Sequence, residues 1–241
     1  MSINIEFSAA SDCNLVKTRI DIWEFPLNNP FQQANSLLNE AELVRANRYH
    51  FERHRRRFTI ARATLRLILG RYLQRDPSQL SFQYSSHGKP GIEGSHGLEF
   101  NLSHSGELAL LAVGCRFPLG VDLEFFSARP YDGIAKNLFS PQELEFFLKL
   151  PKHLKPQVFF QIWAQKEAFI KASGLGLSYP TKLFTVPIFS TSTERIMDTV
   201  HHCDWLMNSF MPQVACSGAL CYHPEVKELR YARLDNPAIL F

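Results

Sequence analysis

Two short segments carry acidic residues at spacings that suit a metal ion and a phosphate group. The first segment, Gly120 to Glu124, reads Gly-Val-Asp-Leu-Glu. In a β-strand, residues two apart face the same side, so Asp122 and Glu124 would lie next to each other. Neighbouring carboxylates repel each other unless a cation lies between them or one of them takes up a proton. This motif alone also fits an edge strand with a solvated acidic face.

The second segment is Trp163 to Lys171, in which Glu167 and Lys171 are one helical turn apart. By itself this pair also fits an exposed helix salt bridge, which contributes only about 0.3–0.5 kcal/mol. Together, the carboxylates of Asp122, Glu124 and Glu167 can form an oxygen cage that leaves Mg²⁺ positions for water and phosphate. The two motifs therefore predict a Mg²⁺ site and a phosphate-containing substrate.

Two further segments carry groups that can bind phosphate. Asn101 to Ser105 ends a predicted strand and presents the hydroxyl of Ser103 and the imidazole of His104. Serine hydrolysis is disfavoured, because no GxSxG turn is present and adjacent strand residues face opposite sides. His87 to Pro90 predicts a turn that projects Lys89. Each segment also fits a purely structural turn or a solvated loop.

A basic helix precedes these segments. Nine arginines lie between positions 45 and 71, and most are expected on solvated helix faces. An apolar stripe at helical spacing predicts the buried face of this helix. The stripe consists of Phe58, Ala61, Leu65, Ile68 and Leu69. Arg57 lies at one edge of the stripe, and Arg55, Arg62 and Arg66 lie at the other. One or two arginines can grip a phosphate with two N–H groups, with Arg57 preferred and Arg62 as the alternative.

The remaining pattern places strands and helices in the same order twice. Asn39 with Glu42, and Ser140 with Glu143, predict capped helix starts, and Gly174 is predicted to end a helix over residues 157–173. Strands are expected over residues 16–22, 98–102, 108–115, 119–123, 183–188, 214–222 and 229–234. This order predicts an α+β fold of two similar halves, residues 1–117 and 118–241, with the metal site in the second half.

The composition is that of an ordinary globular protein. The 241 residues are 45% hydrophobic and 20% charged, and the net charge of +3 does not demand a nucleic-acid partner. Five cysteines without a CxxC pair favour a reducing cytoplasm over a disulfide framework. The start of the chain does not look like a signal peptide, and no stretch approaches the roughly 20 apolar residues that span a bilayer. We expect a cytoplasmic protein without a membrane partner.

In this order the motifs resemble those of the 4′-phosphopantetheinyl transferase superfamily, in its larger, monomeric, surfactin-synthetase-activating class. That family has a G-x-D-x-E strand and, further along, W-x-x-K-E-A-x-x-K on a helix; here Asp122 and Glu167 are 45 positions apart. The H-G-K-P and N-x-S-H-S elements, the arginine-bearing run Arg55 to Phe58 and the run Gly174 to Leu177 also stand in family order. The resemblance covers residues 40 to 180.

The resemblance implies two similar α+β halves related by a pseudo-twofold, with coenzyme A bound between them. It implies Asp122, Glu124 and Glu167 as Mg²⁺ ligands. Lys171 is implied as the contact to the pyrophosphate of coenzyme A. Glu167 and Lys171 are thereby the candidate catalytic residues, with Glu167, directly or through a metal-bound water, as candidate base for the incoming hydroxyl.

The nucleotide site implied by the resemblance uses residues from the first half. Arg57 and His104 match positions that bind the 3′-phosphate of coenzyme A, and Lys89 and Ser103 match positions that line the nucleotide site. Arg45 and Arg48 are candidates for further basic residues of this site.

The implied reaction moves the 4′-phosphopantetheine arm of coenzyme A onto a serine of an apo acyl or peptidyl carrier protein and releases adenosine 3′,5′-bisphosphate. A Mg²⁺-dependent phosphohydrolase or nucleotidyl transferase with the same carboxylates is the alternative. A non-catalytic module that binds coenzyme A or a carrier protein is a third hypothesis. The three differ in whether the mass of a carrier changes and whether coenzyme A is consumed.

The carrier protein is expected to dock beside residues 125–147, which connect the two acidic motifs. Phe125, Phe126 and Phe139 are candidates for exposed apolar contacts, although all three would also fit a core. Basic residues that could meet an acidic carrier are Arg129, Lys152 and Lys155.

Overall fold

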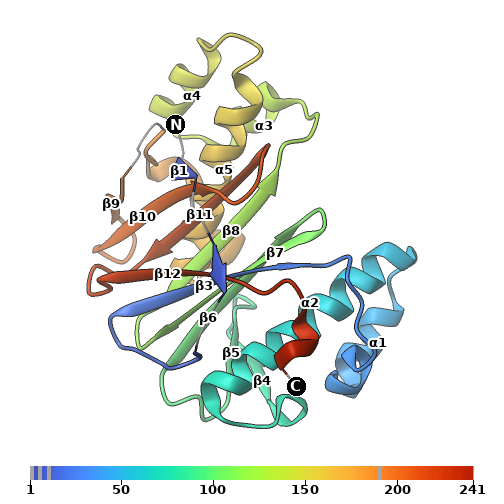
Figure 1. Cartoon of the computed structure of the whole chain (residues 1–241). Coiled ribbons are helices and arrows are strands. Elements are labelled where there is room, and N and C mark those ends of the chain that lie inside the picture. The colour runs from blue at the N-terminus through green and yellow to red at the C-terminus, as the bar shows by residue number, and fades with distance from the viewer. Residues whose placement is uncertain (1–2, 5–6, 10–11, 189–191, 241) are drawn as a thin grey trace.

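Two β-sheets packed face to face, each with a long helix on its outer face, form the body of the chain (Figure 1). The computed structural model describes residues 3–4, 7–9, 12–188 and 192–240. The strands are β1 (Ile3–Asn4), β2 (Ser8–Ala9), β3 (Arg19–Pro26), β4 (Phe82–Tyr84), β5 (Pro90–Ile92), β6 (Leu98–Ser105), β7 (Leu108–Cys115), β8 (Leu119–Phe125), β9 (Glu194–Asp198), β10 (Cys203–Met211), β11 (Cys216–Tyr222) and β12 (Glu228–Arg233). The α-helices are α1 (Glu40–Asn47), α2 (Glu52–Leu73), α3 (Tyr131–Leu138), α4 (Pro141–Leu148) and α5 (Lys155–Ser173).

The two sheets repeat one topology. The first sheet has the order β2-β12-β3-β7-β6, and the second has β1-β10-β11-β8 with β9 beside β10. In the first sheet β3 pairs with β7 and β7 with β6, all antiparallel. In the second sheet β8 pairs with β11 and β11 with β10 in the same way. Each half therefore follows the order strand, helices, strand, strand, as an α+β fold of two similar halves requires.

Three apolar clusters separate the layers. One lies between α2 and the strands β3, β6 and β7. A second lies between α5 and the strands β10 and β11. The third joins the inner faces of the sheets through β3, β7, β8 and β11. Four of the five residues in the apolar stripe expected on the basic helix are buried, because Ala61, Leu65, Ile68 and Leu69 are all at most 4% exposed. The fifth, Phe58, is half-buried at the edge of another apolar cluster.

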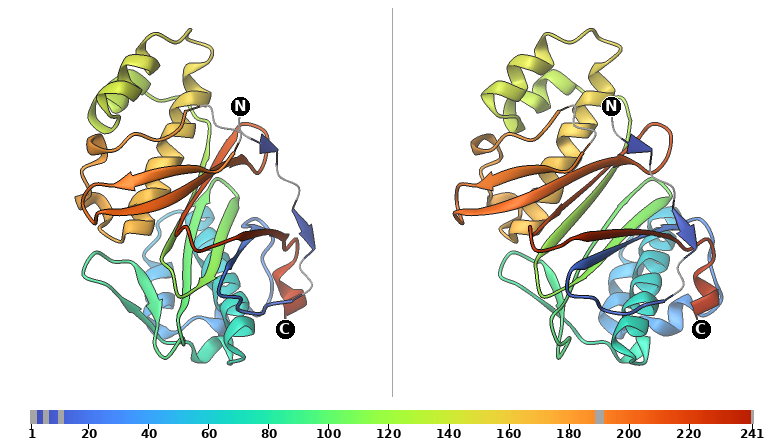
Figure 2. Two further views of the ribbon diagram at one scale, coloured as in Figure 1. Left: turned by 90° about the vertical axis from the view of Figure 1, so that its left-hand side faces the viewer. Right: turned by 60° about the vertical axis from the view of Figure 1, so that its left-hand side comes forward.

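A strand near each end of the chain joins the sheet of the opposite half. Strand β12, near the C-terminus, pairs in parallel with β3 of the first sheet, and β1, near the N-terminus, pairs in parallel with β10 of the second. Figure 2 shows β1 beside the second sheet and the C-terminal turn beside α2. Arg230 of β12 donates to both carboxylate oxygens of the buried Asp21 on β3, at 2.8 and 2.7 Å. Each sheet is therefore completed by the far end of the chain.

Local signals located several element boundaries. Both capping boxes form, because Asn39 with Glu42 and Ser140 with Glu143 make reciprocal side-chain and backbone hydrogen bonds. Gly174 ends α5 in the left-handed conformation, with φ of 78°. The strands β9 and β10 and the helix α3 lie in stretches to which the sequence pattern assigned no element. In the described residues no helix is long and apolar enough to cross a membrane.

The strand expected over residues 183–188 is wrong. A 3₁₀ turn ends at Leu183, and irregular chain follows it. Side chains satisfy this segment instead of a neighbouring strand: Lys166 donates to the carbonyls of Thr181 and Phe184, and Glu143 accepts from the amide of Val186. The alternating apolar pattern reflects burial against α5 and not sheet pairing.

Candidate active site

The two sheets meet at their edge strands β6 and β8, where side chains of β6 hold the backbone of β8. The Oδ1 atom of Asn101 accepts from the amide of Val121 at 2.8 Å. The hydroxyl of Ser105 accepts from the amide of Phe125 at 3.1 Å. Because residues two apart share one face of a strand, Asn101, Ser103 and Ser105 all point to this seam. The seam fixes the position of the acidic strand relative to the first half.

Asp122 lies at the middle of the seam and is 4% exposed. Its Oδ1 atom accepts hydrogen bonds from the hydroxyl of Ser103 at 2.8 Å and from the ammonium of Lys171 at 2.6 Å. Lys171 also donates to the carbonyl of Val121 at 3.2 Å. Lys171 thus pairs with Asp122 across the helix–strand interface, and not with Glu167 on its own helix. The Oδ2 atom of Asp122 is buried without a hydrogen-bond partner.

Glu124 and Glu167 lie within electrostatic reach of Asp122. Burial, and then the charge of Asp122, raise the pKa of Glu124 to about 7. Burial and the charge of Asp122 also raise the pKa of Glu167, and Lys171 opposes that rise. Ser105 donates a long hydrogen bond of 3.4 Å to Glu124. The ionised forms of Glu124 and Glu167 are therefore disfavoured, which a cation between the carboxylates would relieve.

The donor chemistry of this site fits Mg²⁺. In the described ranges no three His, Cys, Asp or Glu side chains converge as a preformed metal cluster. The unpartnered Oδ2 atom of Asp122 nevertheless offers an oxygen that the protein leaves unsatisfied. Glu124 and Glu167 add carboxylate oxygens, the ligands that hard cations prefer. These three residues are therefore the ones that could hold the ion.

Gly120 determines how closely α5 approaches β8. A Cβ atom at this position would lie 2.1 Å from the carbonyl oxygen of Ala168 and 2.4 Å from the amide nitrogen of Ala172. Both distances are far below van der Waals contact, so only glycine allows this packing. The glycine of the first acidic motif therefore brings Lys171 within reach of Asp122.

Arg57 and His104 lie near each other on the first-half side of the seam. Desolvation, and then the positive charges of Lys171 and Arg57, lower the pKa of His104. Arg57 donates from Nε at 3.0 Å and from Nη2 at 2.7 Å to one oxygen of Glu107. Three basic side chains, those of Arg57, His104 and Lys171, therefore lie beside the acidic site.

Lys89 has a different environment from a solvated loop lysine. Its ammonium donates to the carbonyls of Leu119 at 3.0 Å and Ala172 at 3.5 Å. Desolvation lowers its pKa, and Glu99 opposes this effect. Lys89 therefore fastens the β4–β5 hairpin to the end of α5. A pocket of about 220 Å³ lies beside it, lined in part by Asn101 and Lys171.

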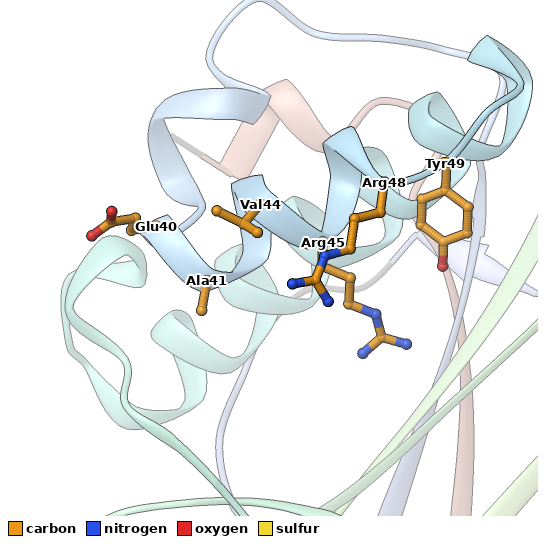
Figure 3. Close-up of a pocket in the computed structure, with 6 residues that line it drawn as sticks. All are labelled: Glu40, Ala41, Val44, Arg45, Arg48 and Tyr49. Carbon is orange, nitrogen blue, oxygen red and sulfur yellow. The ribbon is translucent and has the colours of Figure 1, made fainter.

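Arg45 and Arg48 lie on the outer face of α1. With Val44 and Tyr49 they line a pocket of about 750 Å³. Figure 3 shows their guanidinium groups close together and directed to the same side as the Tyr49 ring. The guanidinium of Arg45 also lies 5.1 Å from the ring centre of Phe58 on α2.

Two arginines expected at the solvated edge of α2 have internal partners. Arg66 is completely buried, donating to Glu42 at 2.9 Å and to the carbonyl of Leu80 at 3.0 Å. Arg62 also pairs with Glu42, and its guanidinium lies 3.8 Å from the ring centre of Phe82. The buried carboxylate of Glu42 draws both side chains inward, which helical periodicity alone does not reveal.

The expectation of an exposed Phe139 is wrong. This side chain is 1% exposed and packs in a core with Phe147 and Phe159. Phe125 and Phe126 are half-buried and pack against the edges of apolar clusters. Phe139 comes directly after the last residue of α3, and its side chain packs against α4 and α5.

The motifs quoted from the sequence contain Asn101, Ser105 and Gly120 but predict no role for these three residues, and nothing in the sequence points to Glu107. The pattern Asn-x-Ser-x-Ser places three polar residues on one face of a strand. Such a face needs polar partners when it is buried. The roles of Gly120 and Glu107 depend on neighbours distant in sequence and carry no local signal.

Two family models match the chain. The model described as 4′-phosphopantetheinyl transferase, N-terminal, matches residues 22–116, and the one described as 4′-phosphopantetheinyl transferase superfamily matches residues 118–216. The 4′-phosphopantetheinyl transferase HetI of Nostoc sp. is 43% identical over 75% of this chain and 78% of its own length. The 4′-phosphopantetheinyl transferase Sfp of Bacillus subtilis is 28% identical over 80% of this chain and 86% of its own length. The chain therefore belongs to the 4′-phosphopantetheinyl transferase superfamily and is a transferase of this kind.

Proposed function

We propose that this enzyme transfers the 4′-phosphopantetheine group of coenzyme A to a serine of an apo acyl or peptidyl carrier protein and releases adenosine 3′,5′-bisphosphate. The observation that carries the proposal is the buried Asp122, held by Ser103 and Lys171 with its Oδ2 atom unpartnered. A lone buried carboxylate oxygen beside an ammonium suits a metal ion and a pyrophosphate.

In this proposal Asp122, Glu124 and Glu167 hold Mg²⁺, which when bound offsets the negative charge that develops on the pyrophosphate oxygens. Lys171 adds a positive charge to the same group. The serine oxygen forms a bond to the β-phosphorus of coenzyme A, and the bond from that phosphorus to the bridging oxygen breaks. Glu167 accepts the serine proton, directly or through a water molecule.

The nucleotide binds on the first-half side of the seam. Arg57 and His104 read the 3′-phosphate, and the action of the Arg57 charge on His104 supports a shared anion site. Ser103 lines the same site while it holds Asp122. Lys89 shapes the wall of the site by holding the β4–β5 hairpin in place. Arg45 and Arg48 are the candidates for further basic contacts, and they line a pocket formed by α1 and the residues just after it.

The enzyme acts as a monomer in the cytoplasm in this proposal. All five cysteines are free thiols, which supports a reducing compartment.

The test is the intact mass of an apo carrier protein after incubation with the enzyme, coenzyme A and Mg²⁺. We expect the carrier to gain the mass of one phosphopantetheine group on a serine, and adenosine 3′,5′-bisphosphate to accumulate in equal amount. Consumption of coenzyme A with an unchanged carrier would point to the hydrolase alternative. Binding of coenzyme A without consumption would point to the non-catalytic module.

A further inference from the structure

Glu107 accepts hydrogen bonds from two arginines near the start of α2, Arg56 and Arg57. It lies in the turn between β6 and β7, three residues after His104. Its Oε1 atom accepts three hydrogen bonds, one from Arg56 Nη2 at 2.8 Å and two from Arg57, by Nε at 3.0 Å and Nη2 at 2.7 Å. One carboxylate oxygen therefore engages two guanidinium groups at once.

The backbone holds Glu107 in this position. Its carbonyl accepts from the amide of Leu27 at 2.8 Å, which anchors the turn to the end of β3. Gly106 before it has φ of +55°, and a Cβ atom there would lie 3.2 Å from the ring of Phe125. The turn is therefore fixed on both sides, and the carboxylate is presented to α2 from a rigid base.

The side chains of the cluster are partly exposed to solvent. The side chains of Arg56 and Glu107 are each 36% exposed, and that of Arg57 is 24% exposed. The charge of Arg57 acts on His104, and that of Lys171 does too. Glu107 thus places a negative charge in direct contact with Arg56 and Arg57, at the edge of the proposed nucleotide site.

We propose that Glu107 determines the affinity and phosphate specificity of the nucleotide site, as a resident carboxylate that competes with the 3′-phosphate of the nucleotide for Arg57. This inference rests on the proposed function. A phosphate and a carboxylate both accept from the same two N–H groups of a guanidinium fork. Glu107 also lowers the positive potential that attracts a phosphate. The enzyme therefore binds coenzyme A less tightly than its arginines alone would allow.

The test is Glu107→Gln, which removes the charge and keeps the size of the side chain. Calorimetry without a carrier protein compares the binding of coenzyme A and of dephospho-coenzyme A, which lacks the 3′-phosphate. We expect the dissociation constant for coenzyme A to fall roughly threefold to tenfold, the scale of a partly solvent-screened charge. That for dephospho-coenzyme A should change little, so the preference for the 3′-phosphate grows.

Two further variants make the result specific. Glu145→Gln removes the same charge from α4, where Glu145 is 70% exposed and pairs with Lys149, and we expect no change in either affinity. The gain from Glu107→Gln should disappear when Arg57 is also replaced by Gln, because the gain acts through Arg57. If Glu107→Gln does not fold, Glu107→Ser removes the same charge with a smaller side chain.

The outcomes separate this inference from the proposed function. Weaker binding of coenzyme A by Glu107→Gln would overturn the inference and make Glu107 a residue that positions Arg57. An unchanged preference would also overturn it. If the wild-type enzyme binds both nucleotides equally, the proposal that Arg57 and His104 bind the 3′-phosphate is contradicted. That result comes from the wild-type enzyme alone, before any variant is made.

Discussion

At the scale of single residues, the site depends on which charged side chains pair with each other. Lys171 meets Asp122 on the neighbouring strand, and Ser103 completes the contact. Burial, and then the charge of Asp122, raise the pKa of Glu124 and Glu167. Removing Asp122 would therefore leave the partly buried ammonium of Lys171 without its counter-ion and alter every charge around it.

Replacing Asp122 by Asn should lower the rate of transfer by at least about a hundredfold, the scale of losing one electrostatic contact to a transition state. The measurement is the rate of carrier mass gain at saturating coenzyme A. Circular dichroism should report an intact fold. Asp204→Asn is the control, because Asp204 pairs with Arg195 at the surface and should keep its activity. Wild-type rates in a folded Asp122→Asn variant would exclude the metal and substrate role.

At the scale of elements, the site depends on two close approaches, one between β6 and β8 and one between β8 and α5. The first is bridged by alternating polar side chains of β6. The second is possible because small residues face each other across it, Gly120 on β8 and Ala168 and Ala172 on α5. These contacts decide whether the acidic strand and the lysine of α5 act on the same substrate.

Gly120→Ala should destabilise the fold by at least about 3 kcal/mol, because the added methyl group overlaps the backbone of α5. Urea unfolding gives the free energy, and the transfer rate should fall as α5 moves away from Asp122. Gly133→Ala is the matched control, since a Cβ atom there meets nothing within 4 Å. As Gly133 lies inside α3, its replacement should be neutral or stabilising by up to about 1 kcal/mol. Equal stability of the two variants would refute the close-packing explanation.

Asp198, at the end of β9, should make the free energy of unfolding depend on pH in the acid range. Burial alone would raise the pKa of Asp198, but hydrogen bonds from Tyr179, His201 and nearby amides outweigh it and lower the pKa to about 2. A carboxylate with a lowered folded-state pKa stabilises the fold above its unfolded pKa, and this stabilisation is lost as pH falls toward the folded value.

Asp198→Asn should therefore be less stable than wild type near neutral pH, as measured by the free energy of unfolding in urea. The difference should narrow as the pH falls from about 5 to about 3. Asp132→Asn serves as the control, because Asp132 is 55% exposed in its pair with Lys155. A difference that stays constant over this range would show that the charge of Asp198 is not what matters.

At the scale of the whole molecule, the chain closes on itself. Strand β12 follows every element of the second half and yet lies in the first sheet, between β2 and β3. Arg230 on β12 and Asp21 on β3 are 209 positions apart and form a partly buried ion pair. Unfolding one half would therefore expose a strand of the other, so we expect the two halves to unfold together.

Arg230→Gln should lower the free energy of unfolding by about 2–4 kcal/mol, because it leaves the buried carboxylate of Asp21 short of a partner. The urea transition should stay single when followed by both circular dichroism and tryptophan fluorescence. Arg195→Gln, which breaks a surface pair with Asp204, should cost at most about 1 kcal/mol. Two separate transitions in the wild-type protein would contradict the coupling of the halves.

Features that depend only on neighbours along the chain follow from the sequence. The spacing of Asp122 and Glu124 sets a shared strand face, and the capping residues Asn39 and Ser140 set helix starts. Gly174 sets a helix end through its left-handed backbone. These features follow from periods of 2 and 3.6 residues and from hydrogen bonds within a few positions. That is why the order of elements and the acidic motifs were readable before any fold was known.

Contacts between side chains that are distant in sequence depend on how the elements pack in three dimensions. Arg66 is buried because Glu42 and the carbonyl of Leu80 satisfy it, and Phe139 is buried because α4 and α5 surround it. The contact of Glu107 with Arg57 joins residues 50 positions apart. An arginine or a phenylalanine has the same local pattern on a surface and in a core, and burial depends on partners that arrive from elsewhere in the chain.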